Sequence, residues 1–149
     1  MEIVLFEPEI PQNTGAILRS ASCFGFSVSL IEPLGFILSS SKLKRGGMDY
    51  LDDLNLKTYS SFEDFLAQKK EGRILLLSPD SNKLHNAFDY IETDFLLMGK
   101  ESSGVPEFVQ NRSDEVLRIP MLLQKRSLNL AVSASIVMCE AAYKIGQTQ

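Results

Sequence analysis

The sequence is poor in the residues that hold metals and form disulfide bonds. Its 149 residues include one histidine, His85, and two cysteines, Cys23 and Cys139, that stand far apart. A catalytic zinc site usually takes three protein ligands, and a disulfide framework needs several cysteines. We therefore expect no metal and two buried thiols in a reducing, cytoplasmic setting. His85 falls in a predicted loop within reach of a substrate, and we assign it no catalytic role.

Long apolar runs and a positive net charge are also missing. No apolar run approaches the roughly 20 residues of a membrane-spanning helix, so no membrane contact is expected. The net charge of −4 argues against a generic nucleic-acid binder, which is basic overall. Short basic clusters remain, although such runs are usually solvated surface: Lys42, Lys44 and Arg45, and then Lys125 and Arg126. The length and ordinary composition favour one domain over residues 1–149.

Apolar segments of two kinds alternate along the chain. Strands are predicted at Glu2–Phe6, Val28–Ile31, Leu56–Tyr59, Arg73–Ser78, Asp94–Met98 and Val116–Ile119. Helices are predicted after Asn13, Ser61 and Pro106 and over Leu128–Ile145. The alternation predicts an α/β domain with a mostly parallel sheet. Ligands of such sheets bind at the carboxyl ends of strands, so the segments after Phe6, Ser78, Met98 and Ile119 are the candidate sites.

Two of these segments contain small and polar residues. The stretch GKESSG, from Gly99 to Gly104, has the glycine spacing of a phosphate loop, but Val105 follows where such a loop needs lysine. The spacing alone favours a plain glycine-rich turn and leaves a ligand loop open, in which Glu101 bonds a hydroxyl or an amine. After Phe6, Asn13-Thr14-Gly15 opens a helix whose N-terminus suits an anion. Arg19, on its first or second turn, has apolar neighbours that indicate partial burial.

The last helix begins close to polar residues. Ser127 is a plausible N-cap, which leaves Asn129 unexplained as a poor helix former inside the first turn. Ala131, Ser135 and Met138 form one stripe of this helix, and apolar residues form a second. A helix that is apolar nearly all round must be buried nearly all round. In so small a domain this predicts a homodimer interface.

Three segments together resemble a known family. EPEIPQNTGAILR, LLMGKESSGVPE and RIPM…RSLNLAVSASIVMCEA look like motifs one, two and three of the SpoU class of SPOUT RNA methyltransferases. The match is closest to the small TrmL-type (YibK-like) tRNA 2′-O-methyltransferases and covers nearly the whole chain. Lys100, Ser103 and the letters NLAVS depart from the usual TrmL-type pattern and resemble wider SpoU usage.

The resemblance implies a fold and a cofactor. The fold is an α/β domain with a C-terminal deep trefoil knot, through which two subunits pair. The cofactor is S-adenosyl-L-methionine, held in the knot largely by backbone groups. Carried over position by position, the cofactor contacts are Leu77, Met98, Gly99, Glu101, Gly104, Ile119, Met121, Ser127 and Leu128.

The resemblance also implies the reaction, methyl transfer to a ribose 2′-hydroxyl of the wobble nucleotide of tRNA. Arg19 would orient the ribose or stabilise the developing alkoxide, because a guanidinium barely deprotonates. Asn13 would position Arg19 or the ribose, and Asn129 would fix the motif-three loop. In a dimer the two basic clusters, with Arg19, would line one RNA groove.

The sequence is also compatible with other functions. The first is a SpoU enzyme for another RNA such as ribosomal RNA, although such enzymes often carry an extra RNA-binding domain. The second is a non-catalytic RNA-binding protein of the same fold, against which the presence of Arg19, Glu101, Ser127 and Asn129 counts. The weakest is a nucleotide-binding metabolic α/β protein.

Overall fold

The computed structural model describes residues 1–38, 54–122 and 127–146. The strands are β1 Glu2–Phe6, β2 Ser27–Ile31, β3 Leu56–Tyr59, β4 Ile74–Leu77, β5 Lys83–Leu84, β6 Phe95–Met98 and β7 Glu115–Arg118. The helices are α1 Pro11–Phe24, α3 Phe62–Gln68, α4 Glu107–Gln110 and α5 Leu130–Lys144, and a short 3-10 helix spans His85–Ala87. Each of the six predicted strands is present within one or two residues, and β5 is an addition.

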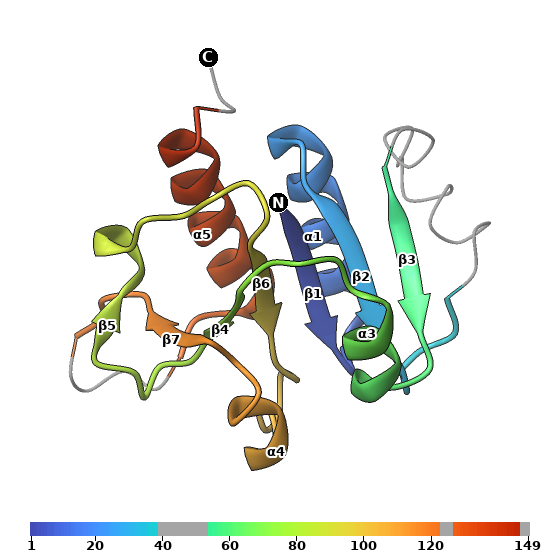
Figure 1. Ribbon diagram of the computed structural model, residues 1–149. Coiled ribbons are helices and arrows are strands. Elements are labelled where there is room, and N and C mark those ends of the chain that lie inside the picture. The colour runs from blue at the N-terminus through green and yellow to red at the C-terminus, as the bar shows by residue number, and fades with distance from the viewer. Residues whose placement is uncertain (39–53, 123–126, 147–149) are drawn as a thin grey trace.

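The strands form one sheet in the order β3-β2-β1-β6-β4-β7-β5, and neighbouring strands pair in parallel. β1 lies near the middle, with Leu5 aligned with Leu30 of β2 and with Met98 of β6. The arrowheads of β1, β2, β3 and β6 point the same way in Figure 1, so their carboxyl ends share one edge. The predicted α/β class is confirmed, whereas the trefoil knot stays a prediction.

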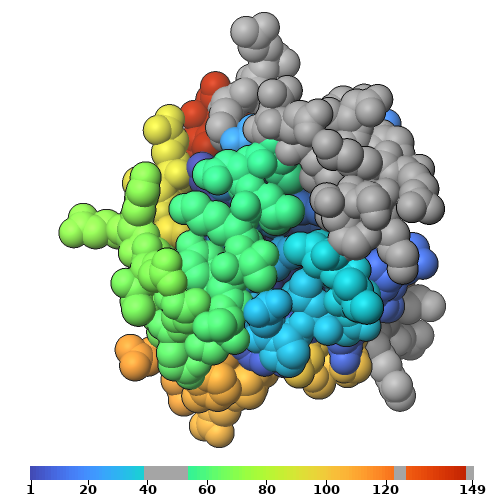
Figure 2. All heavy atoms as spheres, turned by 90° about the vertical axis from the view of Figure 1, so that its right-hand side faces the viewer, coloured from blue at the N-terminus to red at the C-terminus, as the bar shows by residue number. Residues whose placement is uncertain are grey.

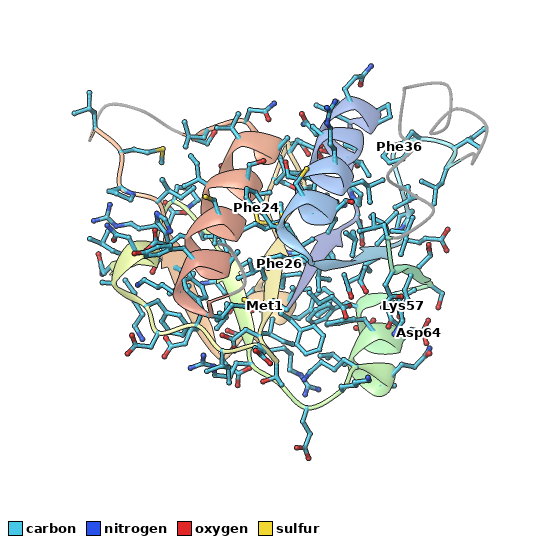
Figure 3. All side chains as sticks on the ribbon, turned by 90° about the horizontal axis from the view of Figure 1, so that it is seen from above. Met1, Phe24, Phe26, Phe36, Lys57 and Asp64 are labelled. Atoms are coloured by element: carbon cyan, nitrogen blue, oxygen red, sulfur yellow. The ribbon has the colours of Figure 1, made fainter. Side chains whose placement is uncertain are left out.

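Alternating side chains divide the core into two layers. Ile3 and Leu5 of β1 pack with α1 and α5 on one face, while Val4 and Phe6 pack with α3 and α4 on the other. Successive strand residues point to opposite faces, so a continuous apolar run fits a sheet covered on both sides. Each large apolar side chain buried this way stabilises the fold by about 1.5–3 kcal/mol. Figure 3 shows α1 and α5 side by side over their face of the sheet.

Local capping sets the start of two helices. Ser61 is the N-cap of α3, as predicted, since its hydroxyl accepts from the backbone N–H of Asp64 at 3.1 Å. α1 begins earlier than predicted, because Pro11 has a fixed φ that suits the first helical position. Arg19 therefore lies in the third turn of α1 rather than the first or second. Its side chain is exposed on the outer side of the helix, which corrects the expected partial burial.

The last helix is buried on one side only. Ala134, Val137 and Ala141 are fully buried against α1 and the sheet. Val132, Ile136 and Tyr143 are exposed on the opposite side, with 47%, 37% and 75% of their surface accessible. Only one helix face can contact the sheet of its own chain, so the expected burial nearly all round requires a dimer partner and stays a prediction.

Three sequence expectations for single residues are also corrected. Cys23 and Cys139 are exposed thiols, not buried ones, because they lie on the outer sides of α1 and α5. His85 is buried instead of lying in an open loop. It starts the 3-10 helix, and its carbonyl accepts a hydrogen bond from the Tyr90 hydroxyl at 3.0 Å. Burial lowers the pKa of His85, since desolvation penalises the charged imidazole.

The face that Figure 2 presents carries β3 and α3 next to the segment Glu32–Leu38. This segment follows β2 and turns back against β1. The Gly35 N–H donates to the Pro8 carbonyl at 2.9 Å. A Cβ at Gly35 would lie 2.7 Å from the Glu9 backbone, so only glycine allows this approach. The close contact holds the segment after β1 from one side.

Candidate functional site

A pocket of about 620 Å³ opens at the carboxyl edge of the sheet. Its walls come from the segments after β1, β4, β6 and β7 and from the start of α5. This is where parallel sheets bind ligands, because the loops after neighbouring strands converge there. The volume lies within the usual range for small-molecule sites, about 300–1,000 Å³.

The pocket brings together most of the residues singled out in the sequence. All nine expected cofactor contacts line it: Leu77, Met98, Gly99, Glu101, Gly104, Ile119, Met121, Ser127 and Leu128. Asn13 and Asn129 line it as well, but Arg19 does not. The basic residues expected to bind RNA, Lys42, Lys44, Arg45, Lys125 and Arg126, lie outside the described residues.

The stretch GKESSG forms a tight hairpin at the mouth of the pocket. The Lys100 N–H donates to the Gly104 carbonyl at 2.8 Å, and the Gly104 N–H donates back to Lys100 at 3.0 Å. Gly104 has a φ of +68°, a conformation that favours glycine. A Cβ at Gly99 would lie 2.5–2.8 Å from the Gly104 backbone. Both glycines are thus needed for the hairpin to close, and the stretch is a tight turn that also lines the pocket.

Glu101 points from this hairpin to the start of α1. Its carboxylate accepts from the backbone N–H of Glu9 at 2.8 Å and of Ile10 at 3.2 Å. It also accepts from the Asn13 amide at 3.0 Å. A negative charge is favourable at a helix N-terminus, where backbone N–H groups lack partners. The sequence suggested a bound anion such as a phosphate at this helix end, whereas the Glu101 carboxylate of the chain itself takes that place.

The hydrogen bonds that continue from Glu101 have a fixed direction. A carboxylate only accepts, so Asn13 turns its NH₂ group toward Glu101 and its oxygen away. That oxygen accepts from the Asn129 amide at 2.9 Å. The Asn129 oxygen accepts in turn from Ala131 N–H at 2.9 Å and Val132 N–H at 3.3 Å. This row of hydrogen bonds from Glu101 through Asn13 to Asn129 links the three motif segments and orients the side-chain amides of Asn13 and Asn129.

Asn129 is the N-cap of α5, a role that the sequence interpretation gave to Ser127. The helix starts at Leu130, two residues later than expected, because the Asn129 side chain satisfies two of its first N–H groups. Asn129 therefore lies outside the first turn, where its low helix propensity has no cost. Ser127 is exposed and free to serve the pocket wall.

Charges at the hairpin are paired locally. The Lys100 ammonium forms an ion pair with Glu7, and the hydrogen bond to that carboxylate raises the pKa of Lys100. Glu9 accepts from both the backbone N–H and the hydroxyl of Ser102, each at 2.9 Å. The hydroxyl bond, followed by the backbone bond, lowers the pKa of the Glu9 carboxyl. Lys100 and Glu9 thus each form charged contacts with neighbouring residues of the hairpin or of the segment after β1.

Sequence reasoning missed several residues of the pocket wall, among them Ile10, Pro79, Asp80, Gln110 and Ser133. The strand-end rule points to the Pro79–Asp80 turn after β4, whereas Gln110 and Ser133 come from helices and give no such signal. Among the residues that the structure describes, no group of three metal-ligating side chains occurs. In the same part of the chain, no helix is long and apolar enough to cross a membrane.

Known proteins are similar to this chain in sequence and in fold. The tRNA (cytidine(34)-2′-O)-methyltransferase of Beijerinckia indica is 42% identical over 146 residues, covering 97% of this chain and 91% of the relative. A solved structure concerned with the 2-OH methylation of C/U34 on tRNA has a TM-score of 0.88 and 42% identity, covering 96% of this chain and 94% of that one.

A more distant structure shows the same fold with a ligand. The SpoU methyltransferase AviRb of Streptomyces viridochromogenes, in complex with the cofactor AdoMet, has a TM-score of 0.83 at 22% identity, covering 97% of this chain and 57% of that one. The profile of the SpoU rRNA Methylase family matches residues 1–139, which is most of the chain. The chain therefore belongs to the SpoU rRNA Methylase family, as the three motifs in its sequence indicated.

Proposed function

We propose that this methyltransferase moves a methyl group from S-adenosyl-L-methionine to the ribose 2′-hydroxyl of the wobble nucleotide, cytidine or uridine 34, of tRNA. The observation that carries the proposal is the full-length similarity to enzymes of this activity. The position of the three motif segments around one pocket supports it independently. A tRNA substrate agrees with an activity in the cytoplasm.

The pocket walls suit this cofactor. Leu77, Met98 and Leu128 would supply apolar contacts for an adenine ring, and the backbone of the Gly99–Gly104 hairpin lines the same pocket. When bound, the cofactor supplies an electrophilic methyl group on a positively charged sulfur. The proposed contacts are the nine residues that the resemblance implied and that line the pocket.

Asn13 and Asn129 would position the target ribose. Both amides have their orientation set by the row of hydrogen bonds from Glu101 to the start of α5. Each NH₂ group keeps a second N–H, because only one is used within the row. A prearranged donor costs no reorientation when the oxygen of the 2′-hydroxyl becomes negative.

Arg19 would act across a homodimer interface. It shares the outer side of α1 with Ala16 and Cys23, next to the exposed apolar residues of α5. The two helices run in the same direction, with Asn13 against Asn129 and then Ser20 against Ser135. A second copy covering this surface would bury the apolar stripe and bring Arg19 toward the pocket of the partner. There its guanidinium would orient the ribose or stabilise the alkoxide, without acting as the base.

Methyl transfer from labelled S-adenosyl-L-methionine to total tRNA, followed by mapping of the modified nucleotide, tests the proposal. Arg19→Ala should abolish transfer and leave S-adenosylhomocysteine binding nearly unchanged, because Arg19 would contact the ribose of the bound tRNA and not the cofactor. Loss of both activity and binding would assign Arg19 a structural role.

Sedimentation equilibrium tests the dimer, and a monomer at micromolar concentration contradicts it. The five basic residues of the two clusters are proposed RNA contacts, so binding should weaken as salt rises.

A further inference from the structure

Two loops at the pocket are joined by reciprocal hydrogen bonds, in which a carboxylate of each loop accepts from a backbone N–H of the other. Glu101, from the hairpin after β6, accepts from the backbone N–H of Glu9. Glu9, from the segment after β1, accepts from the backbone N–H of the next hairpin residue, Ser102. The Ser102 hydroxyl adds a third bond at 2.9 Å. We call this crossed arrangement of Glu9, Glu101 and Ser102 the carboxylate clasp.

The clasp joins segments that the sheet already places side by side. β1 and β6 are neighbours, with Leu5 aligned with Met98, so their carboxyl ends emerge together. Sheet hydrogen bonds end there, however, and the hairpin after β6 extends beyond them. Beyond that point the clasp, the Glu101 bond to the Ile10 N–H and the ion pair of Lys100 with Glu7 connect the hairpin to the segment after β1.

The backbone of Glu9 has a close contact with a third segment, the one that follows β2. Gly35 lies against the Glu9 backbone so closely that a Cβ would be 2.7 Å away. The neighbouring Pro8 carbonyl accepts the Gly35 N–H. The Glu9 side chain, which accepts from Ser102, therefore extends from a backbone that packs closely against Gly35.

We propose that Glu9 and Ser102 are positioning residues for methyl transfer, which keep the Gly99–Gly104 hairpin in place so that Glu101 stays on Asn13 and the pocket wall keeps its shape. This inference rests on the proposed function. Neither residue needs to touch the reacting atoms. Their effect passes through Glu101 to the Asn13 and Asn129 amides, and through the hairpin backbone to the cofactor.

Calorimetric titration with S-adenosylhomocysteine, together with steady-state kinetics on tRNA, tests the pair. Glu9→Ala should weaken binding and lower kcat by about ten-fold, because it removes two hydrogen bonds to a charged group. Ser102→Ala should lower both by about three-fold, because it keeps the backbone bond and the lost hydroxyl bond is exposed to solvent. The double variant should be no worse than Glu9→Ala, since Glu9→Ala already removes the hydroxyl bond that Ser102→Ala removes. Ser102→Thr should restore wild-type values because it keeps the hydroxyl. Glu92→Ala removes an exposed carboxylate from the turn before β6, away from the hairpin, and serves as the control.

Unchanged binding and kcat in Ser102→Ala and Glu9→Ala, even with a lower melting temperature, would overturn the proposal and leave the clasp a structural detail. Fully additive losses would also overturn it. If Glu9→Ala does not fold, Ser102→Ala decides, because its side chain is exposed and only one hydroxyl is lost. Wild-type protein that binds S-adenosylhomocysteine but methylates no tRNA contradicts the proposed function alone, since the binding constants still judge the clasp.

Discussion

Substitution of Asn129 separates two roles that its side chain combines. The side-chain oxygen caps α5, and the NH₂ group donates to Asn13. Asn129→Ala removes both. The lost cap costs about 1 kcal/mol, and the lost hydrogen bond costs about 1 kcal/mol more. A destabilisation of about 2 kcal/mol corresponds to a fall in melting temperature of about 4–8 °C for a chain of this length.

Asn129→Asp keeps the cap and removes the donor. A carboxylate accepts from the same two N–H groups and gains from the positive helix N-terminus, so stability should stay within about 1 kcal/mol of wild type. Asn13 would then stand between two acceptors, Glu101 and the new carboxylate, and its NH₂ group can turn to only one of them. The fixed direction of the row is lost although the helix is intact.

The two variants should therefore differ in stability and agree in activity. We expect methyl transfer to fall by about ten- to a hundred-fold in both, as one oriented hydrogen bond contributes about 1.4–3 kcal/mol to a transition state. Urea unfolding and single-turnover methylation of tRNA measure the two effects separately. Wild-type activity in Asn129→Asp would refute the reasoning, because Asn129 would then be only a helix cap.

Three further predictions concern other parts of the fold. Gly99→Ala should abolish S-adenosylhomocysteine binding, measured by calorimetry, because its Cβ would collide with the Gly104 backbone. Arg73→Ala should lower the free energy of unfolding in urea by about 2 kcal/mol; it leaves the fully buried Asp94 carboxylate without its ion pair, and the partial exposure of Arg73 moderates the loss. His85 has a folded-state pKa below its unfolded value, so its contribution to stability is present above about pH 6.5 and lost in more acidic solution. His85→Gln should flatten melting temperature against pH between about 7.5 and 5.

The sequence was sufficient for six of the seven described strands, for their parallel arrangement and for the position of the pocket, but not for β5 or the strand order. The buried runs at β4 and β6 are apolar throughout because both faces of a parallel sheet are covered, and that pattern is visible without a structure. Glycines and polar residues directly after such strands then marked the pocket wall, Gly99 and Ser78 among them. Local apolar patterns therefore predict strands, and the residues that follow those strands predict the pocket wall.

Side-chain partners were not predictable, since they join residues about 90 or more positions apart. Glu101 was expected to bond a ligand, yet its carboxylate closes the start of α1, from Glu9 to Asn13. Ser127 and Asn129 are both acceptable N-caps by residue type, and only the path of the chain decides between them. Arg19 was expected to be partly buried, but the register of α1 turns it outward.

The most direct test of the central claim uses two tRNA substrates that differ in a single oxygen. One has a ribose at nucleotide 34, and the other has a 2′-deoxyribose there with all other nucleotides unchanged. We expect transfer of one methyl group from labelled S-adenosyl-L-methionine to the first substrate and none to the second. Equal transfer to both would contradict the assignment of the wobble 2′-hydroxyl as the acceptor.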